Sequence, residues 1–498
     1  MKKNILLLGA VSLMYTIAWS QSIVVKDKTT LQPIQLAIVN SLSEAGDSQA
    51  TLTDDKGMAD ISQMRTSNSI RIHIVGYQPY FSTYIKLREN NGEVLLSESS
   101  HMFNEVVVSA NRFAEKQRDI AQPVEVISSR EIAFSNANTA ADVISNTGNV
   151  LVQKSQQGGG SPIIRGFETN KVLLVVDGVR MNNAIYRGGH IQNIITLDNA
   201  IMDRVEILYG PGSVMYGSDA LGGVMHFFTK NPTLSSTSTL AAHGNAFARY
   251  STAADEKTFH ADLSLGMKLG SLTSFTYSDF GDLTQGSDRD DKYPNFGKRT
   301  FYAERQNEED VQVINDDPDV QIGSSYTQYD FLQKFTYMQS ENVSHALNIQ
   351  YSTSTDIPRY DRLSETANGV LRFGDWYYGP QERMLAAYSL HLDNQQGLFN
   401  RGRITAAYQK IEESRHDRRF GREFINHRTE QVDVLTLNAD FAKDVGNSEW
   451  RYGLEGTTNH VDSKANQESL LTGEAKGQTT RYPSDGSDVS SAAIYLSD

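Results

Sequence analysis

The sequence predicts a mainly β protein with three parts: a small β-sandwich, a mixed α+β domain and an incomplete transmembrane antiparallel β-barrel. Three observations lead to this fold class. The chain has 498 residues, more than one ordinary soluble domain needs. From residue 235 onward, apolar and polar residues alternate in repeated segments of about ten residues. After the first 20 residues no apolar run is long enough for a membrane helix, so any membrane crossing must use strands.

Composition excludes several classes of function. The formal net charge is −14, which gives no basic surface for nucleic acid. The absence of cysteine excludes a disulfide scaffold, a thiolate metal site and a cysteine nucleophile. The turn Gly210-Pro211-Gly212-Ser213 lacks the lysine that a phosphate-binding loop requires. With no nucleophile–base–acid set visible either, we expect no enzyme, no cofactor and no metal held by the protein itself.

The first 20 residues are predicted to be a secretory signal peptide. Lys2 and Lys3 give the positive start, and a short apolar stretch runs from Ile5 to Trp19. Small residues near Ser20 suggest cleavage before Gln21. The alternative is a buried core helix. Export places everything downstream in the periplasm, in the outer membrane or outside the cell.

Residues 22–98 are predicted to form a small all-β module. Strand-like runs at 23–25, 37–39 and 70–74 are separated by turn signals such as Asp54-Asp55-Lys56-Gly57. The order of these pieces resembles the carboxypeptidase regulatory-like β-sandwich found at the front of many Bacteroidetes outer-membrane receptors. The resemblance implies an accessory or spacer domain, placed in the periplasm.

Residues 104–110 contain a short β-forming run in a polar linker, with no partner strand nearby in the sequence. An exposed strand of this kind recruits another strand through its unpaired backbone groups. The segment resembles the TonB box of TonB-dependent outer-membrane receptors, which implies that TonB binds it. The alternative is an ordinary strand of the next domain. The residues of the expected box are Glu105, Val106, Val107, Val108, Ser109 and Ala110.

Residues 111–232 carry four motifs in order: I-I-R-G-F at 163–167, V-V-D-G-V at 175–179, R-V-E-I-L-Y-G-P-G-S at 204–213 and Y-G-S-D-A-L-G-G-V at 216–224. Together they resemble the plug domain of TonB-dependent receptors. The resemblance implies that Arg165, Arg204 and Glu206 pair with charges on the barrel wall and lock the plug. The alternative is that they form surface ion pairs of little energetic value.

Residues 235–498 are predicted to be barrel strands. Apolar residues alternate with polar ones over the eleven residues from Phe259 to Leu269, enough for one tilted spanning strand. Similar patterns begin at Met384, Leu435 and Trp450. Long polar segments such as 288–319 would be the outside loops. The family barrel has roughly 22 strands, of which this region would supply about half, so we expect the chain to be a fragment.

The plug loop around Tyr186, Arg187 and His190 resembles that of haem and haemoglobin receptors, which makes His190 a candidate axial ligand. Segments 356–363 and 376–381 resemble barrel segments of the same subfamily. A second haem ligand would lie beyond residue 498. The alternatives are a solvated histidine, or a ferric siderophore recognised by Tyr186, Arg187 and loop arginines. The basic stretch 415–428 could contact the carboxylates of haem or of a ferric chelate, but is more typical of a charged loop.

The resemblance implies an outer-membrane transporter that works with TonB and is surrounded by outer-membrane lipid. Its cargo would be haem, a haemoprotein or a ferric siderophore, and the inner-membrane proton gradient would supply the energy. Two other classes remain open. One is a surface binding protein that does not transport, such as an adhesin. The other is a secreted hydrolase, which the missing catalytic set disfavours.

Overall fold

The structure is a computed structural model. It describes residues 22–28, 30–42, 49–65, 67, 69–74, 77, 80–90, 92–97, 107–108, 113, 115–116, 122–186, 193–235, 239–446 and 448–498. The chain divides into two compact units, Met1–Val106 and Val107–Asp498, and each is described by itself. Among the described residues, no helix is long and apolar enough to cross a membrane.

The first unit consists of two small sheets around one apolar core, in agreement with the predicted fold class. One sheet has the order β4-β1-β7 and the other the order β3-β2-β5-β6. Strand β1 alternates between buried and half-buried residues, as a strand with one face on a core should. Thr83 caps helix α2 by accepting a hydrogen bond from the Lys86 backbone N–H. The elements are β1 (Ser22–Asp27), β2 (Ile38–Leu42), β3 (Ala50–Leu52), β4 (Met58–Asp60), η1 (Ser62–Met64), β5 (Ser69–His73), β6 (Tyr80–Ser82), α2 (Tyr84–Glu89) and β7 (Glu93–Leu96).

The second unit contains a mixed α+β domain, which we call the inner domain (residues 122–235). Its five-stranded sheet has the order β10-β16-β17-β14-β15, and a three-stranded sheet has the order β11-β12-β13. The predicted strands at 172–176, 203–208 and 224–228 are all present. Helix α3 begins with a capping box between Ser128 and Glu131. The main elements are β10 (Val124–Ser128), α3 (Ser129–Ser135), α4 (Ala140–Ser145), β11 (Leu151–Gln153), β12 (Ser161–Ile164), β13 (Phe167–Glu168), η3 (Thr169–Lys171), β14 (Val172–Val176), β15 (Val179–Arg180), η4 (Asn193–Thr196), η5 (Asn199–Ile201), β16 (Met202–Tyr209), α5 (Ser213–Tyr216), η6 (Ser218–Ala220) and β17 (Gly223–Thr229).

The inner domain has an apolar core of its own. Aliphatic and aromatic side chains from its sheets and helices pack together with almost no exposed surface. Burial of this apolar area is the main force that holds the domain together. Members of the core include Ile132, Ala141, Ile144, Ile164, Val172, Val176, Ile194, Val205, Ile207, Met225 and Phe227.

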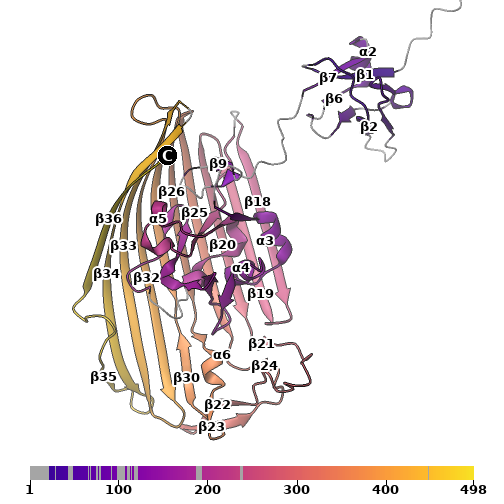
Figure 1. The fold of residues 1–498 in the computed structure, drawn as a ribbon. Helices are drawn as coiled ribbons and strands as arrows, with labels where there is room; N and C mark the ends of the chain where they lie inside the picture. The colour runs from indigo at the N-terminus through magenta and orange to yellow at the C-terminus, as the bar shows by residue number, and fades with distance from the viewer. Residues whose placement is uncertain are drawn as a thin grey trace, which may run out of the picture. The chain divides into compact units, whose positions relative to one another are not determined.

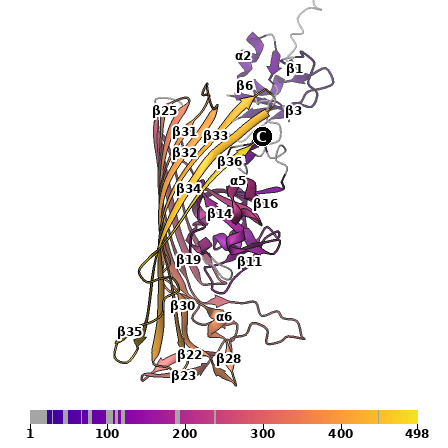
Figure 2. The same ribbon diagram turned by 60° about the vertical axis from the view of Figure 1, so that its left-hand side comes forward.

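Most of the remaining residues of the second unit form a thirteen-stranded sheet, which we call the wall. Figures 1 and 2 show that it curves around the inner domain. Its neighbours along the main path are antiparallel, as predicted for a barrel sheet. The long strands are β18 (Ala241–Ser251), β19 (Glu256–Gly266), β20 (Leu269–Phe280), β25 (Tyr326–Ser340), β26 (Val343–Ser354), β31 (Glu382–Leu392), β32 (Arg401–Arg419), β33 (Phe424–Val445), β34 (Ser448–Ser469) and β36 (Ser487–Ser497); the short ones are β27 (Ile357–Pro358), β30 (Phe373–Tyr378) and β35 (Ala475–Gly477).

The two faces of the wall differ in chemistry. Along the long strands from β19 to β34, exposed apolar side chains alternate with buried polar ones that face the inner domain, whereas β18 and β36 contain no buried residue. This is the pattern of an outer-membrane sheet with lipid on one side and a polar lumen on the other. Outward residues include Phe259, Leu263, Phe275, Phe331, Leu347, Met384, Leu435, Leu437, Trp450 and Leu454; inward ones include His260, Thr276, Lys334, Asn348, Gln350, Arg383, Gln409, Asn438 and Asp440.

Two sequence-based boundaries were wrong. The predicted strand 259–269 is in fact β19, which ends at Gly266, and the chain reverses over Met267 and Lys268 into β20. Alternation continues across this turn in the sequence, which hid the reversal. The basic stretch from Arg415 was expected in a loop, but β32 continues to Arg419.

The segments between wall strands gather at one end and carry small elements of their own: β21 (Leu283–Thr284), β22 (Phe301–Gln306), β23 (Glu309–Ile314), β24 (Val320–Gln321), α6 (Tyr360–Leu363), β28 (Thr366–Ala367) and β29 (Val370–Leu371). The hairpin β22–β23 lies within the polar segment predicted as a loop. Asp310 ties it to β32 by accepting a 2.6 Å hydrogen bond from the Arg418 guanidinium, and Arg418 also pairs with Asp375 at 2.6 Å. Arg418 holds the pKa of the Asp310 carboxyl below its usual value against the opposing effect of burial.

Candidate functional site

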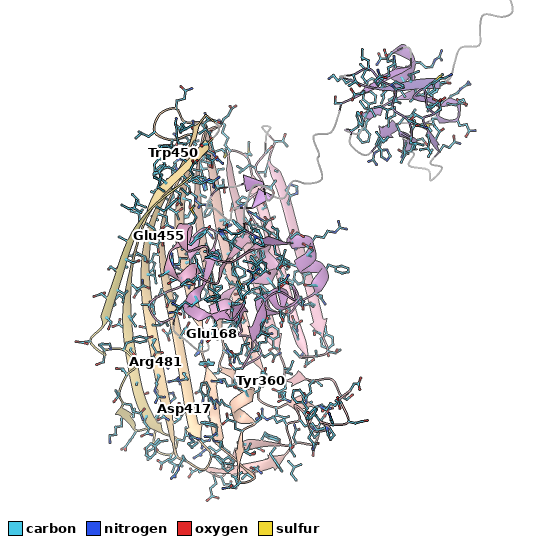
Figure 3. The ribbon with its side chains drawn as sticks, viewed as in Figure 1. Glu168, Tyr360, Asp417, Trp450, Glu455 and Arg481 are labelled. Atoms are coloured by element: carbon cyan, nitrogen blue, oxygen red, sulfur yellow. The ribbon has the colours of Figure 1, made fainter. Side chains whose placement is uncertain are left out.

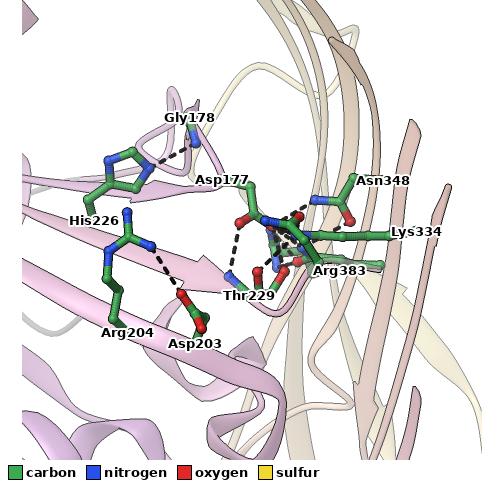
Figure 4. Close-up of polar contacts among 11 residues, drawn as sticks. Asp177, Gly178, Asp203, Arg204, His226, Thr229, Lys334, Asn348 and Arg383 are labelled. Carbon is green, nitrogen blue, oxygen red and sulfur yellow. Dashed lines mark hydrogen bonds and ion pairs between the residues drawn. The ribbon is translucent and has the colours of Figure 1, made fainter. Parts of the chain in front are cut away.

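One contact between the inner domain and the wall lies at the turn between β14 and β15. Asp177 and Gly178 both have positive φ, 48° and 87°, which is the backbone of a tight hairpin turn. This turn directs the Asp177 carboxylate toward the wall (Figure 4). Within the inner domain it accepts hydrogen bonds from the Thr229 backbone N–H at 2.9 Å and from the Thr229 hydroxyl at 2.7 Å.

The same carboxylate accepts three contacts from wall strands. Asn348 Nδ2 lies at 2.8 Å, Gln350 Nε2 at 3.2 Å and Lys334 Nζ at 3.2 Å. Lys334 is 7% exposed and also donates to the Thr229 carbonyl at 3.0 Å. A buried ammonium is stable only when its charge and its donors are satisfied, so Asp177 and Lys334 depend on each other.

Arg180 on β15 makes a second connection. Its guanidinium pairs with Asp219 of the inner domain at 2.8 Å and with Glu455 of β34 at 2.9 Å. Its backbone carbonyl accepts a hydrogen bond from Gln409 of β32 at 2.9 Å. A third connection joins Lys230 to Asp262 of β19 at 3.0 Å. These ion pairs and amide hydrogen bonds lie beside apolar contacts between domain and wall, such as that of Val179 with Leu385 and that of Ile201 with Leu272.

The three residues predicted to lock the plug lie on the inner domain. Arg204 pairs with Asp203 at 3.0 Å and with Glu206 at 2.7 Å, and Glu206 is 3% exposed. Arg165 is exposed at a φ of 50°, with its guanidinium 5.8 Å from the Tyr209 ring centroid. The structure thus brings Arg204 and Glu206 together, through contacts inside the inner domain.

The wall contacts of Asp177, Arg180 and Lys230 were missed by sequence reasoning. Asp177-Gly178 was recognised only as a turn. Its partner Lys334 looks like any polar residue of an alternating strand, and no local signal links positions so far apart. The one indication in the sequence was that Asp177 lies in a predicted turn and also within the motif V-V-D-G-V at 175–179.

His226 on β17 is a further buried polar group that the sequence did not reveal. Its Nε2 accepts a hydrogen bond from the Gly178 backbone N–H at 2.9 Å, and its ring stacks on Phe228 at 3.8 Å. Arg204 covers the other side of Phe228, also at 3.8 Å. Burial, then the positive charges of Arg403 and Arg204, lower the pKa of His226 well below its usual value. The imidazole is therefore neutral and acts as an acceptor.

The predicted cargo residues are only partly described. Tyr186 packs against the core of the inner domain and lines a small cavity with Arg383 and Gln409 of the wall. Arg187 and His190 lie outside the described residues. In the described part of the chain, no group of three or more His, Cys, Asp or Glu side chains is placed to hold a metal ion.

Most of the predicted TonB box also lies outside the described residues: Glu105, Val106, Ser109 and Ala110. The backbone of Val107 and Val108 forms β8 (Val107–Val108), which pairs antiparallel with β9 (Glu115–Lys116). The expectation of no partner strand nearby was therefore wrong. The partner is a polar dipeptide without a β-forming pattern, which is why the sequence gave no sign of it.

Comparison with known proteins agrees with this architecture. Residues 116–224 match the family model described as TonB-dependent Receptor Plug Domain. The chain is 33% identical over 271 residues to the vitamin B12 transporter BtuB of Vibrio vulnificus strain CMCP6, covering 52% of this chain and 40% of that protein. It is 35% identical over 127 residues to BtuB of strain YJ016, covering 25% and 20%. The chain thus spans less than half the length of these relatives.

Two solved structures share the fold. The copper transporter OprC is 11% identical, with a TM-score of 0.53, over 71% of this chain and 48% of that one. The haemophore receptor HasR of Serratia marcescens, solved with its haemophore and haem, is 15% identical, with a TM-score of 0.55, over 76% and 49%. Residues 116–224 are therefore similar to the plug domain of TonB-dependent receptors, and plug and wall together share the fold of these two outer-membrane structures.

Proposed function

We propose that this chain belongs to the TonB-dependent outer-membrane receptors and is an active transporter, which binds a scarce nutrient at the cell surface and imports it when TonB pulls on the plug. The observation that carries the proposal is the contact between the plug, residues 116–224, and the wall. Asp177–Lys334 and Arg180–Glu455 are polar contacts that can break and re-form, and the apolar contacts beside them are small separate clusters and not one continuous core. The inner-membrane proton gradient supplies the energy in this proposal.

TonB would bind the box formed by residues 105–110 through strand addition. An added strand is held by main-chain hydrogen bonds, and β8 uses one of its edges for β9. Arg165, Arg204 and Glu206 would lock the plug in its resting state; the support is the buried Glu206 carboxylate, held by Arg204. The N-terminal sandwich would be a periplasmic accessory domain of the carboxypeptidase regulatory-like type found in Bacteroidetes receptors.

The proposed cargo is haem or another iron complex, with His190 as iron ligand and Tyr186 and Arg187 beside it. The support is the resemblance of the segments around 186–193 and 356–363 to haem receptors. A second candidate is a corrinoid, favoured by the similarity to two vitamin B12 transporters. A ferric siderophore is the third, and would need no protein ligand on its iron.

The test is an uptake assay in cells that carry the intact receptor. Val107→Pro removes a main-chain donor from the box, so uptake should fall to the level of a strain without TonB, while cargo binding at the surface stays. Labelled haem and labelled cobalamin identify the cargo, and His190→Ala should weaken binding of haem alone. Normal uptake by the Val107→Pro protein, or recovery of the intact receptor from the soluble fraction, would contradict the proposal.

A further inference from the structure

One of the apolar clusters between the plug and the lumen face of the wall surrounds Ile185, in the segment after β15. Ile185 packs there against Ile411 of β32 and against Val432 of β33. Residues two apart on a strand share a face, so Arg415 and Arg428 continue this lumen face toward the loop end. At about 3.4 Å per residue, Arg415 lies roughly 14 Å beyond Ile411 along β32. Both arginines therefore face the lumen beyond the Ile185 cluster.

Arg415 and Arg428 are direct cross-strand partners in the β32–β33 register. Like charges that face each other in this way destabilise a sheet. A third cation, Arg481, follows β35, and its charge and that of Arg428 both act on the Arg415 guanidinium. Figure 3 shows Arg481 and Asp417 on the wall between the plug and the loop end. We call Arg415, Arg428 and Arg481 the arginine triad.

Neighbouring carboxylates compensate the triad incompletely. Arg428 pairs with Asp417 at 3.1 Å, whereas Arg481 approaches Glu430 only to 3.9 Å, beyond hydrogen-bond distance. The Nε of the Arg415 side chain is buried and has no hydrogen-bond partner among the residues that the structure describes. A buried donor left unpaired costs free energy that a bound acceptor would recover.

The other side of Arg415 is aromatic. Tyr378 of β30 is its cross-strand partner there, and the Tyr378 ring meets Trp376 edge-on at 5.0 Å. These rings are themselves engaged by Arg359, which lies 4.5 Å from the Trp376 ring centroid and 5.8 Å from that of Tyr378. They therefore form a rigid border beside Arg415, whose guanidinium, next to two further guanidinium groups, offers paired donors to an anion.

We propose that the arginine triad binds an acidic group of the imported nutrient, either a carboxylate or a phosphate. This rests on the proposed transport function and adds the chemistry that the cargo must present. The guanidinium of Arg415 donates to the anion, and Arg428 and Arg481 help to balance the anion's charge.

The experiment is calorimetric titration of the purified intact receptor with citrate and, separately, with inorganic phosphate at low ionic strength. Wild type should bind at least one of them. Arg415→Gln should weaken that binding about tenfold or more, and Arg415→Lys less, because it keeps the charge and loses the paired donors. Removing one of three like charges should not impair folding. Lys410→Gln, on the opposite face of β32, is the matched control and should bind as wild type does.

Each probe identifies one source of the anion: binding of citrate alone indicates a carboxylate, and binding of phosphate alone a phosphate. The inference is overturned if neither anion binds to wild type, if Arg415→Gln binds like wild type, or if Lys410→Gln is weakened equally. Failure of the transport proposal gives a different result, because the anions would still bind while uptake showed no dependence on TonB.

Discussion

The plug is held together internally by one kind of contact and held in the barrel by another. Its core is apolar and nearly dry, with Val205, Ile207 and Phe227 fully buried. Its contact with the wall combines ion pairs and amide hydrogen bonds, such as those of Asp177 and Arg180, with small separate apolar clusters around single plug residues such as Val179. Apolar packing is lost only when the domain unfolds, whereas polar contacts can be exchanged for water. This difference between the plug core and the plug–wall contact indicates that the plug can separate from the wall while it stays folded.

The largest effect is expected from a change in the plug core. Phe227→Ala removes a fully buried ring and should lower the free energy of unfolding of the plug by about 4 kcal/mol. Hydrogen exchange of the plug strands measures this loss. Phe134→Ala is the control, since that ring on α3 is 91% exposed and should matter little. Equal effects of Phe227→Ala and Phe134→Ala on hydrogen exchange would contradict the view that the apolar core holds the plug together.

A smaller and more local effect is expected at the wall contact. Asp177→Asn leaves the buried Lys334 without its carboxylate partner. This should weaken the binding of the plug to the wall by about 3 kcal/mol. Hydrogen exchange should rise along β14 and β15, while core amides of β16 stay protected. Asp203→Asn removes an exposed partner of Arg204 and serves as the control. If all plug amides instead lost protection from hydrogen exchange, the plug–wall contact and the folding of the plug would not be separable.

The smallest effect concerns pH. His226 is neutral in the folded plug because its pKa lies well below the ordinary value of 6.5. Below that value the unfolded chain binds a proton that the folded plug does not, so stability is complete above pH 6.5 and decreases as pH falls. At pH 5.5 the loss should be about 1 kcal/mol. His226→Gln should abolish this dependence in plug unfolding monitored from pH 8 to 5; an unchanged slope would assign it to other groups.

Local patterns in the sequence were enough to predict the strands of the plug and the chemistry of the wall. Val172–Val176 is a continuous apolar run because both its faces are buried, and the alternation around Phe259 reflects one lipid face and one lumen face. Strand ends were less certain, since the turn at Met267 and Lys268 keeps the same alternation. The TonB box, the cargo residues and the plug lock remain predictions.

What the sequence did not reveal are pairings between distant positions. Asp177 and Lys334, or Arg415 and Arg481, come together only after the sheet has set its register. A charged residue inside a strand looks the same whether it faces a partner, a ligand or water. The register also converts the charged stretch at Arg415, expected in a loop, into part of the lumen wall.

The strand order of the plug sheet has a mechanical consequence. β10 forms one edge of the order β10-β16-β17-β14-β15, and the Asp177 and Arg180 contacts lie at the opposite edge. A load applied at the N-terminal box would reach β10 first and strain its bonds to β16, while the far edge stays anchored. A weak or brief force would therefore detach only β10, which could pair with β16 again afterwards. Release of the whole plug would need a sustained force.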